Sequence, residues 1–281
     1  MKLAVITDTS ASISEVYKNY DNLHILDIPL TIDGTTYSSK EISEEAFYDL
    51  MATCEDVPKS AQPAIGDLVA KIDALKAQGY THILGLFLSK EISGFYQNIF
   101  ALQEDGETIV YFPETSITSA PLGYMVETAL RLAQAGKSWD EIKAAFETQK
   151  EEDRAYMLID DLKWLSKSGR LSNGAAILGT LLNIKPVLTF SQDGKVAVFD
   201  KVRTEKKMMA RMKELLKEGA KPELHQLYII DARGEERAQE LYDYAHAQGF
   251  TDAIRVPFGA VIATHLGLGA VAYAWTPKIK E

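Results

Sequence analysis

The chain opens with the apolar run Leu3-Ala4-Val5-Ile6, and the polar residues Asp8-Thr9-Ser10 follow almost directly. An uninterrupted apolar run of this length, bounded by a turn, is typical of a buried strand, and the serine fits a helix cap. Residues 82–88 and 108–112 repeat the pattern, each with a turn and a predicted helix behind it. Strands that alternate with helices predict crossover units and a mostly parallel sheet.

Hydrophobic periodicity predicts the remaining elements. In the first half, helical periods cover residues 43–53, 65–78, 120–135 and 138–150, and another helix begins near Phe95. In the second half, Asp193-Gly194 separates two apolar runs and indicates a β-hairpin. The elements expected there are strand 155–159, helix 160–168, helix 175–183, hairpin strands 185–190 and 195–199, helix 204–218, strand 226–231, helix 234–248 and strand 253–256.

A chain of 281 residues has the length of about two domains. We expect the boundary near residues 150–160, after the charged stretch Lys150-Glu151-Glu152-Asp153-Arg154. The predicted fold is therefore α/β with two domains. Residues 1–155 form an N-terminal domain with a mostly parallel sheet and flanking helices, and residues 156–281 form a C-terminal mixed α/β domain.

Residues 258–275 lack formal charge over 18 positions, the lower limit for a helix that spans a membrane. The segment also contains Gly259, Gly267 and Gly269, and the polar pair Thr264-His265 lies near its middle. These features favour two short buried strands joined by a glycine loop, so no integral membrane segment is expected.

Composition excludes several classes of protein. Forty acidic against 30 basic residues give a net charge of −10, which opposes binding to a phosphate backbone, so a nucleic-acid partner is not expected. A single cysteine, Cys54, permits neither an intrachain disulfide nor a cysteine-based zinc site. The five histidines include no His-x-x-x-His pair for a metal. The first eight residues turn polar too soon for a signal peptide, which indicates a cytoplasmic protein.

Two glycine motifs resemble nucleotide-binding sequences, but their positions in the chain argue against that function. Gly136-Lys137-Ser138 resembles the end of a phosphate loop, but it follows a predicted helix instead of opening one. Gly267-x-Gly269-x-x-Ala272 resembles a dinucleotide fingerprint, but only nine residues follow it, too few for the helix and strand that this fold needs. No ATP site is visible, so the chain is not expected to act as a kinase by itself.

Ser93-Gly94 lies between a predicted parallel strand and a helix, at the edge of the sheet where open α/β proteins bind ligands. The free N–H groups at the start of a helix suit an anion. Ser93 is therefore either a helix cap, the commoner use of serine, or a ligand of an anion. The pair Thr264-His265 is similarly either a satisfied core pair or part of a site.

Several segments taken together resemble the DegV family, whose members include the fatty-acid-binding subunits of bacterial fatty acid kinase. The resemblance covers the whole chain, and its order and spacing make it specific. The matching segments are Ile6-Thr7-Asp8-Thr9-Ser10, Ile28-Pro29-Leu30, Ser60-x-Gln62-Pro63, Ser93-Gly94-x-Tyr96-Gln97, Leu165-x-Lys167-x-Gly169-Arg170-Leu171-Ser172, Lys185-Pro186, Lys201-Val202-Arg203-Thr204 and Thr264-His265-x-Gly267.

The resemblance implies that the two domains enclose one extended long-chain fatty acid in a slot between them. It implies that the carboxyl group is bound by a set of polar residues: Ser93, Gly94, Ser60, Arg170, His265 and Thr264. It further implies a carrier without catalytic residues, metal or cofactor. A separate ATP-dependent kinase would dock at Arg170, Arg203 and Lys206 and convert the carboxyl group to an acyl-phosphate for lipid synthesis.

The chain departs from the family pattern near the expected site. Ala61 and Ala64 replace serines, Phe95 replaces a frequent threonine, and Pro121 replaces a glycine. Ala260, Ala263 and Leu268 replace Pro, Gly and Pro around His265. Ser60 stands where the family usually has threonine and keeps the hydroxyl. Because the polar groups expected at the carboxyl group are retained, we expect the other departures to change which acyl tail fits.

The sequence leaves the role of one basic segment open. Residues 201–221 carry eight basic residues against three glutamates, a pattern of either a solvated helix face or a docking surface.

Two other functions also remain open. An acyl hydrolase or transferase would use Ser93 or Ser10 as nucleophile, His265 as base and Asp8 to orient it, although Gly-x-Ser-x-Gly is absent. The other is a carrier of another amphiphilic acid.

Overall fold

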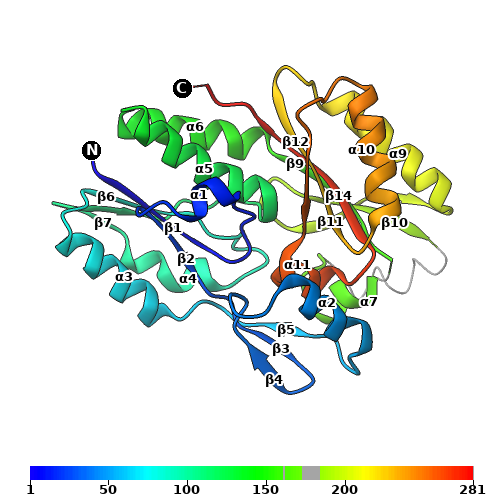
Figure 1. The fold of residues 1–281 in the computed structure, drawn as a ribbon, viewed down its shortest axis with the longest axis horizontal. Coiled ribbons are helices and arrows are strands. Elements are labelled where there is room, and N and C mark those ends of the chain that lie inside the picture. The colour runs from blue at the N-terminus through cyan, green and yellow to red at the C-terminus, as the bar shows by residue number, and fades with distance from the viewer. Residues whose placement is uncertain (161, 173–183, 281) are drawn as a thin grey trace.

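The computed structural model describes residues 1–160, 162–172 and 184–280. Two large sheets dominate it, and a small third sheet lies at one end together with α2 (Figure 1). The prediction of an α/β fold with a mostly parallel N-terminal sheet and a mixed C-terminal sheet is confirmed. The helix expected over 175–183 lies outside the described residues.

The first sheet has the order β2-β1-β6-β8-β7. Its first four strands are parallel, and the short β7 at the edge runs antiparallel to β8. The strands are β1 (Leu3–Asp8), β2 (Leu23–Leu26), β6 (His82–Gly85), β7 (Glu104–Asp105) and β8 (Ile109–Tyr111).

The second sheet has the order β11-β10-β9-β14-β12-β13, in which only β12 and β13 are parallel neighbours. The strands are β9 (Arg154–Leu158), β10 (Lys185–Phe190), β11 (Val196–Val202), β12 (His225–Ala232), β13 (Ile254–Pro257) and β14 (Ala270–Pro277). The expected boundary between residues 155 and 156 falls inside β9, and this strand belongs entirely to the second sheet.

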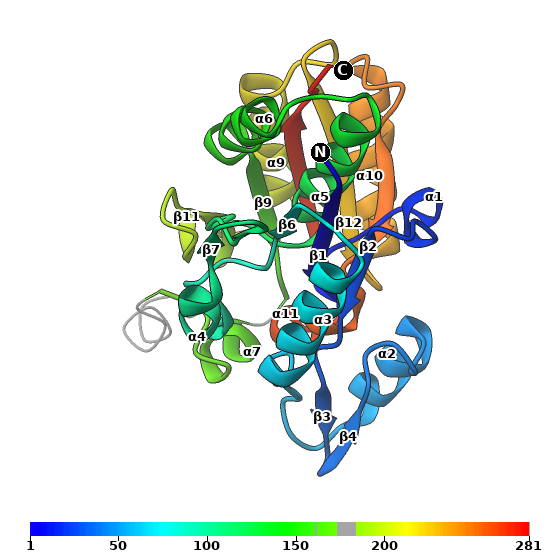
Figure 2. The same ribbon diagram turned by 90° about the vertical axis from the view of Figure 1, so that its left-hand side faces the viewer.

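Helices cover the two large sheets in layers (Figures 1 and 2). Helices α3 (Ile65–Ala77) and α4 (Phe95–Ile99) pack on the outer face of the first sheet, where a short 3-10 turn (Phe100–Leu102) follows α4. Helices α9 (Glu205–Gly219) and α10 (Glu235–Ala247) cover the outer face of the second. Between the sheets lie α5 (Ser119–Gln134) and α6 (Trp139–Glu152).

Strand alternation explains how both faces of each sheet are buried. On β1, Leu3 and Val5 join the central core, while Ala4 and Ile6 face α3 and α4. On β14, alternate residues divide in the same way between the central core and the layer of α9 and α10. A sheet covered on both sides needs continuous apolar strands, which is the pattern that the sequence carries.

The third sheet consists of β4 (Thr35–Tyr37), β3 (Leu30–Ile32) and β5 (Lys59–Ser60), with α2 (Glu44–Thr53) between β4 and β5 in the chain. The remaining helices are α1 (Glu15–Lys18), α7 (Leu162–Lys167) and α11 (Gly259–Leu266). Helix α11 packs against α2, α7, β3 and β5, so the C-terminal half of the chain closes onto the N-terminal half here.

The prediction of two strands within residues 258–275 is wrong. The segment forms α11 followed by β14, and Gly267, with φ of +79°, ends the helix. Helix α11 is buried along almost its whole length, so it has no polar face and no helical period. A short apolar run of this kind does not distinguish a buried helix from a buried strand.

Candidate ligand-binding site

A cavity of about 280 Å³ lies between the carboxyl ends of the first sheet and the inner face of the second. Most of its wall is apolar, which is typical of small-molecule sites. The apolar lining consists of Ile28, Ala61, Leu88, Ile92, Ile117, Pro121, Ala155, Met157, Leu165, Phe190, Val196, Ile230, Phe258, Val261, Ile262, Leu266, Ala272 and Ala274. The other lining residues are Ser60, Gln62, Ser93, Gly94, Thr118, Ser119, Arg170 and His265.

Ser60 and His265 meet at the lining, although they are 205 residues apart in the chain. Ser60 ends β5, where it pairs with Leu30 of β3, and His265 lies in the last turn of α11. The Ser60 Oγ lies 2.7 Å from Nε2 of His265, within hydrogen-bond distance. The other ring nitrogen, Nδ1, is buried and has no partner among the described residues.

Burial and the nearby charge of Arg170 lower the pKa of His265 to about 3. The imidazole is therefore neutral at neutral pH, with one nitrogen able to donate and the other able to accept. A neutral ring so close to a guanidinium adds a hydrogen-bonding group to the site without adding charge.

Arg170 supplies the positive charge at this end of the cavity. Its Nε donates to the carbonyl of Ile92 at 3.3 Å, and its Nη1 donates to the carbonyl of Ser168. Burial lowers the pKa of this guanidinium, which nevertheless stays protonated because arginine ionises only far above neutral pH. Within the described part of the chain its hydrogen bonds go to backbone carbonyls, so the charge is available to an anion.

The N-cap residue of α4 is Gly94, so Ser93 is not itself the cap. The Oγ of Ser93 accepts from the N–H of Phe95 at 3.3 Å, which supports the first turn of α4, and the residue also lines the cavity. Its role as a ligand of an anion stays a prediction. Because this hydroxyl accepts within the protein, its own proton remains to be donated. A Cβ on Gly94 would lie 2.8 Å from Nε2 of Gln62, so glycine lets these segments approach closely.

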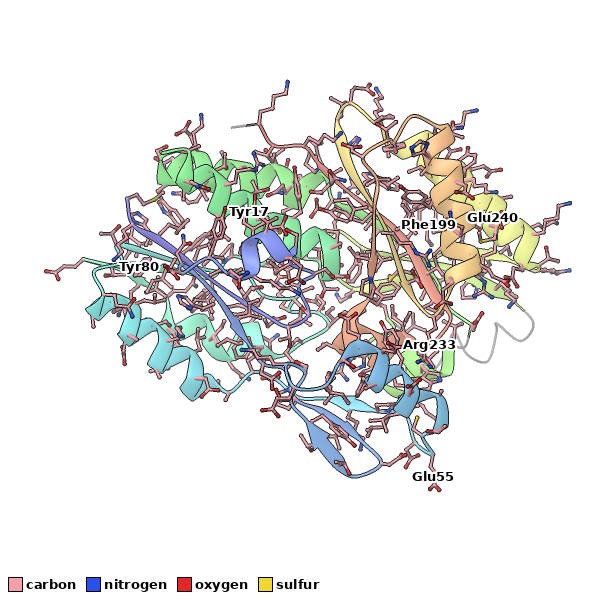
Figure 3. All side chains as sticks on the ribbon, in the orientation of Figure 1. Tyr17, Glu55, Tyr80, Phe199, Arg233 and Glu240 are labelled. Atoms are coloured by element: carbon pink, nitrogen blue, oxygen red, sulfur yellow. The ribbon has the colours of Figure 1, made fainter. Side chains whose placement is uncertain are left out.

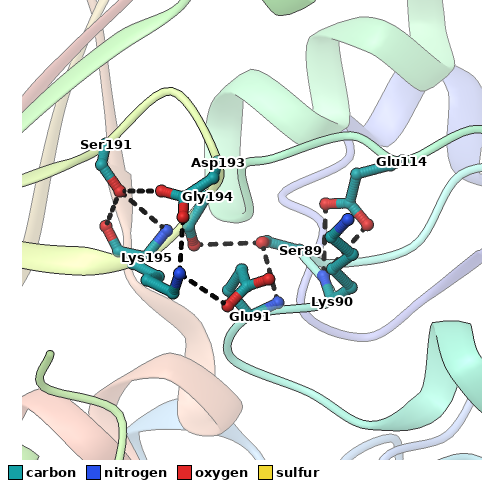
Figure 4. A network of polar contacts seen from close by, with 8 residues as sticks. All are labelled: Ser89, Lys90, Glu91, Glu114, Ser191, Asp193, Gly194 and Lys195. Carbon is teal, nitrogen blue, oxygen red and sulfur yellow. Dashed lines mark hydrogen bonds and ion pairs between the residues drawn. The ribbon is translucent and has the colours of Figure 1, made fainter.

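The loop before Ser93 also contacts the β10–β11 hairpin of the second sheet. Ser89 donates its hydroxyl proton to the carbonyl of Gly194, at the tip of the β10–β11 hairpin, at 3.0 Å (Figure 4). Gly194 has φ of +84°, and a Cβ there would lie 2.2 Å from Oγ of Ser89. Lys195 adds an ion pair with Glu91 at 3.5 Å. This contact positions the loop before Ser93 against the other half of the chain.

An outer groove of about 900 Å³ shares Ser60, Arg170 and His265 with the cavity. These three side chains therefore lie where the cavity and the groove meet. The rest of the groove comes from the third sheet, the loop after α2 and the end of α7, and Glu55 projects from this end of the molecule (Figure 3). A ligand group bound by the three side chains would be close to the surface.

Thr264 does not line the cavity. Its hydroxyl is fully buried and donates to the carbonyl of Ala260 one turn earlier in α11 at 2.8 Å. Of its two possible roles, the structure shows that of a buried core residue with a satisfied hydroxyl.

Arg203 and Lys206 are exposed and lie away from Arg170. Leu171, next to Arg170, bridges Val196 at the beginning of β11, whereas Arg203 follows the end of that strand. At about 3.3 Å per residue, β11 separates Arg170 from Arg203 by roughly 20 Å. The expected docking residues thus form two groups.

The departures from the family pattern fall in different places. Ala61 and Pro121 line the cavity. Phe95 does not: it is fully buried beneath the first sheet, with its ring 5.1 Å from that of Phe87. Ala263 is also fully buried and is absent from the lining. Of these four residues, Ala61 and Pro121 can therefore contact a ligand tail directly.

The residues named for a hydrolase do not assemble into a triad. His265 contacts Ser60 instead of Ser93 or Ser10. Asp8 is fully buried and accepts from the backbone N–H groups of Ser10 and Leu88, at 2.9 and 3.3 Å, and burial raises its pKa.

Gln62, Thr118 and Ser119 line the cavity, but the sequence patterns did not assign them to the site. Gln62 stands inside a segment that matches the family, so the motif was a usable signal for it. The described residues contain no cluster of three metal-binding side chains, and no described helix could cross a membrane.

Comparisons with known proteins agree with this architecture. A family model described as "Uncharacterised protein, DegV family" matches residues 2–278. The DegV domain-containing protein YqaC of Lactococcus lactis is 63% identical over 280 residues, which cover 99% of this chain and 100% of that protein.

Two solved structures are similar over 99% of this chain and 100% of theirs. One is the fatty acid binding DegV family protein SAG1342 from Streptococcus agalactiae, with 44% identity and a TM-score of 0.95. The other is DegV, a fatty acid binding protein from Bacillus subtilis, with 32% identity and a TM-score of 0.88.

Proposed function

The chain belongs to the DegV family, and on that premise we propose that it binds one long-chain fatty acid in the cavity between its two large sheets. The observation that carries this proposal is an apolar cavity with Ser60, Arg170 and His265 where it meets the outer groove. Two solved relatives above 30% identity are described as fatty acid binding, which supports the same ligand class.

The apolar wall provides the driving force for binding. Burying a tail of about 15 methylenes at ~0.8 kcal/mol each offers roughly 12 kcal/mol. Lost translational freedom and ordering of the chain take several kcal/mol of this back. The tail therefore determines affinity, and the polar end determines the orientation of the ligand and its access to solvent.

The polar end compensates the cost of burying a carboxylate, which is several kcal/mol without partners. Arg170 offers a charge, and Ser93 offers a hydroxyl proton. Ser60 and neutral His265 use one of their two protons in the hydrogen bond between them, so the pair offers one further donor. We assign Gly94 to the backbone that approaches the carboxyl group, and Thr264 to the support of the helix that carries His265. No metal or further cofactor is part of this proposal.

We further propose that the chain is a carrier subunit and not itself the kinase. A separate cytoplasmic kinase would transfer the γ-phosphoryl group of ATP to a carboxylate oxygen, giving acyl-phosphate and ADP. Arg170 at the groove, together with exposed Arg203 and Lys206, would contact this partner, because basic side chains steer an acidic surface or ATP phosphates.

Native mass spectrometry of the protein as purified from cells tests the ligand. We expect a mass increment that disappears on denaturation and is identified as a single fatty acid. A folded protein that stays empty after addition of fatty acids would contradict the proposal. Recovery of an isoprenoid acid or another amphiphile would redirect it to a different ligand class.

A serine hydrolase is the second candidate, favoured by the 2.7 Å contact between Ser60 and His265. The pKa of about 3 makes His265 a weak general base, since an effective base titrates near the working pH. Nδ1 also lacks a described partner that would orient the ring. A fluorophosphonate probe separates the candidates, because Ser60 of a carrier should remain unlabelled.

A further inference from the structure

Ser119, the first residue of α5, is an unexplained polar group on the wall of the cavity. The residue is 3% exposed, and its Oγ has no hydrogen-bond partner among the described residues. A buried hydroxyl that loses its water contacts without a replacement costs about 1–3 kcal/mol. Such a group in a native protein is a candidate for binding something that is not part of the chain.

The backbone at Ser119 carries a second cost. Its φ of +58° lies in the left-handed region, which is unfavourable for serine. Two hydrogen bonds fix this conformation: Ser119 N–H donates to the carbonyl of Ser10 at 3.1 Å, and Ser12 N–H donates to that of Ser119 at 3.2 Å. A Cβ on Gly123 would lie 1.9 Å from the carbonyl oxygen of Ser12, so the start of α5 is locked against this loop.

Ser119 lines the cavity without lining the outer groove, as Ser93 also does. It comes from the start of α5, whereas the residues assigned to the carboxyl group come from β5, α11, the loop after α7 and the loop before α4. Because those residues already serve the carboxyl group, an oxygen bound at Ser119 would belong to the tail of the ligand.

The other lining hydroxyls already have partners. Thr118 donates to Oγ of Ser10 at 3.1 Å, Ser93 accepts from Phe95, and Ser60 contacts His265. Ser119 is thus the uncommitted hydroxyl of the cavity, within the part of the chain that the structure describes. It can donate one proton and accept from two directions.

We propose that the Ser119 hydroxyl recognises an oxygen substituent on the acyl tail, so that the preferred ligand class is a hydroxy fatty acid. This inference rests on the proposed fatty-acid function and deepens it. A plain methylene chain would leave the Ser119 hydroxyl unpaired, whereas a tail hydroxyl at the right carbon would satisfy both groups. Sites built to hydrogen-bond a ligand hydroxyl discriminate against the analogue that lacks it.

Binding of stearic acid and of a panel of hydroxystearic acids, substituted at successive carbons, tests this inference. We expect the wild type to prefer one positional isomer over stearic acid by about fivefold, the equivalent of one net hydrogen bond. Ser119→Ala should abolish the preference while it still binds stearic acid. The favoured carbon would report the depth of Ser119 along the tail.

Ser116→Ala is the matched control. Ser116 has the same φ of +58° and lies three residues before Ser119, but it lines a different surface groove of about 720 Å³ and not the cavity. The positional preference should survive this change. If Ser119→Ala fails to fold, Ser119→Gly removes the hydroxyl at a residue that tolerates the positive φ.

The outcomes separate the two proposals. Equal binding of stearic acid and every isomer by the wild type would overturn the role of Ser119 and leave the fatty-acid proposal standing. Retention of the wild-type preference by Ser119→Ala or Ser119→Gly would overturn the role of Ser119 in the same way. A folded wild type that binds none of these acids would overturn the fatty-acid proposal itself.

Discussion

The two ends of the cavity are built in different ways. Its inner wall is part of the second sheet, where Ala272 pairs with Met157 and Ala274 with Ala155 in the ladder between β14 and β9. The polar end depends on side chains from β5, α11 and the loop after α7, joined by contacts such as the one between Ser60 and His265. Strand register determines the shape of the wall, whereas individual side-chain contacts determine the chemistry of the polar end.

The largest expected effect is a dependence of stability on pH that arises at the polar end and not at the wall. His265 titrates with a pKa of about 3 when folded and near 6.5 when unfolded. Between these values the unfolded state binds a proton that the folded state does not. The free energy of unfolding should therefore fall as the pH drops from about 6.5 toward 3, by up to ~1.4 kcal/mol per pH unit.

Urea denaturation of wild type and His265→Gln over this pH range measures the effect. The variant should lose the part of the slope that His265 contributes. His246→Gln, at an exposed histidine on α10, is the control and should keep the wild-type slope. Superimposable slopes for wild type and His265→Gln would show that the polar end does not differ from the wall in this respect.

The second prediction concerns the wall. Ala274→Leu adds three carbons to the cavity and should exclude about three methylenes of the longest tails. At ~0.8 kcal/mol per methylene, affinity for those acids should fall by roughly 50-fold, while shorter acids bind as before. A series of saturated acids of increasing length measures this limit. Ala155→Leu, at the paired position on β9, should shift the same limit, and an equal loss for all lengths would refute the assignment.

Ser93 provides a test of the polar end. Ser93→Ala should reduce phosphoryl transfer by roughly tenfold, the value of one hydrogen bond to a charged group, and change lipid occupancy much less. On the proposed function, the tail would supply most of the affinity, while Ser93 would orient the carboxyl group. Occupancy by mass spectrometry and transfer with the partner kinase give the two numbers. Equal losses would mean that the polar end also anchors the ligand.

The smallest effect on binding is expected outside both ends. If Arg203 lies on the proposed docking surface, Arg203→Glu should leave lipid content unchanged and slow the proposed kinase reaction several-fold, since a charge at the rim of an interface acts mainly on association. Lys217→Glu, an exposed position near the other end of α9, is the matched control and should have a weaker effect. An unaltered rate for Arg203→Glu would remove this residue from the docking surface.

Local patterns predicted much of the fold because the first sheet and the hairpin around Asp193-Gly194 have clear local signals. Helix α11 was missed because it is buried nearly all round and has no period. Local sequence patterns also could not predict the contact between Ser60 and His265, because 205 residues separate them. Only the family resemblance indicated both residues. The same resemblance suggested that Phe95 shapes the tail site, whereas its ring packs beneath the first sheet.

Since the cavity lies between the two large sheets, a bound acyl tail would complete the hydrophobic core that both halves share. The identity of a bound ligand would then affect the thermal stability of the protein. A ligand at about 100 times its dissociation constant adds ~2.7 kcal/mol to the free energy of unfolding. Samples loaded with different acids should melt at different temperatures, so melting curves would rank the acids by their affinity for the cavity.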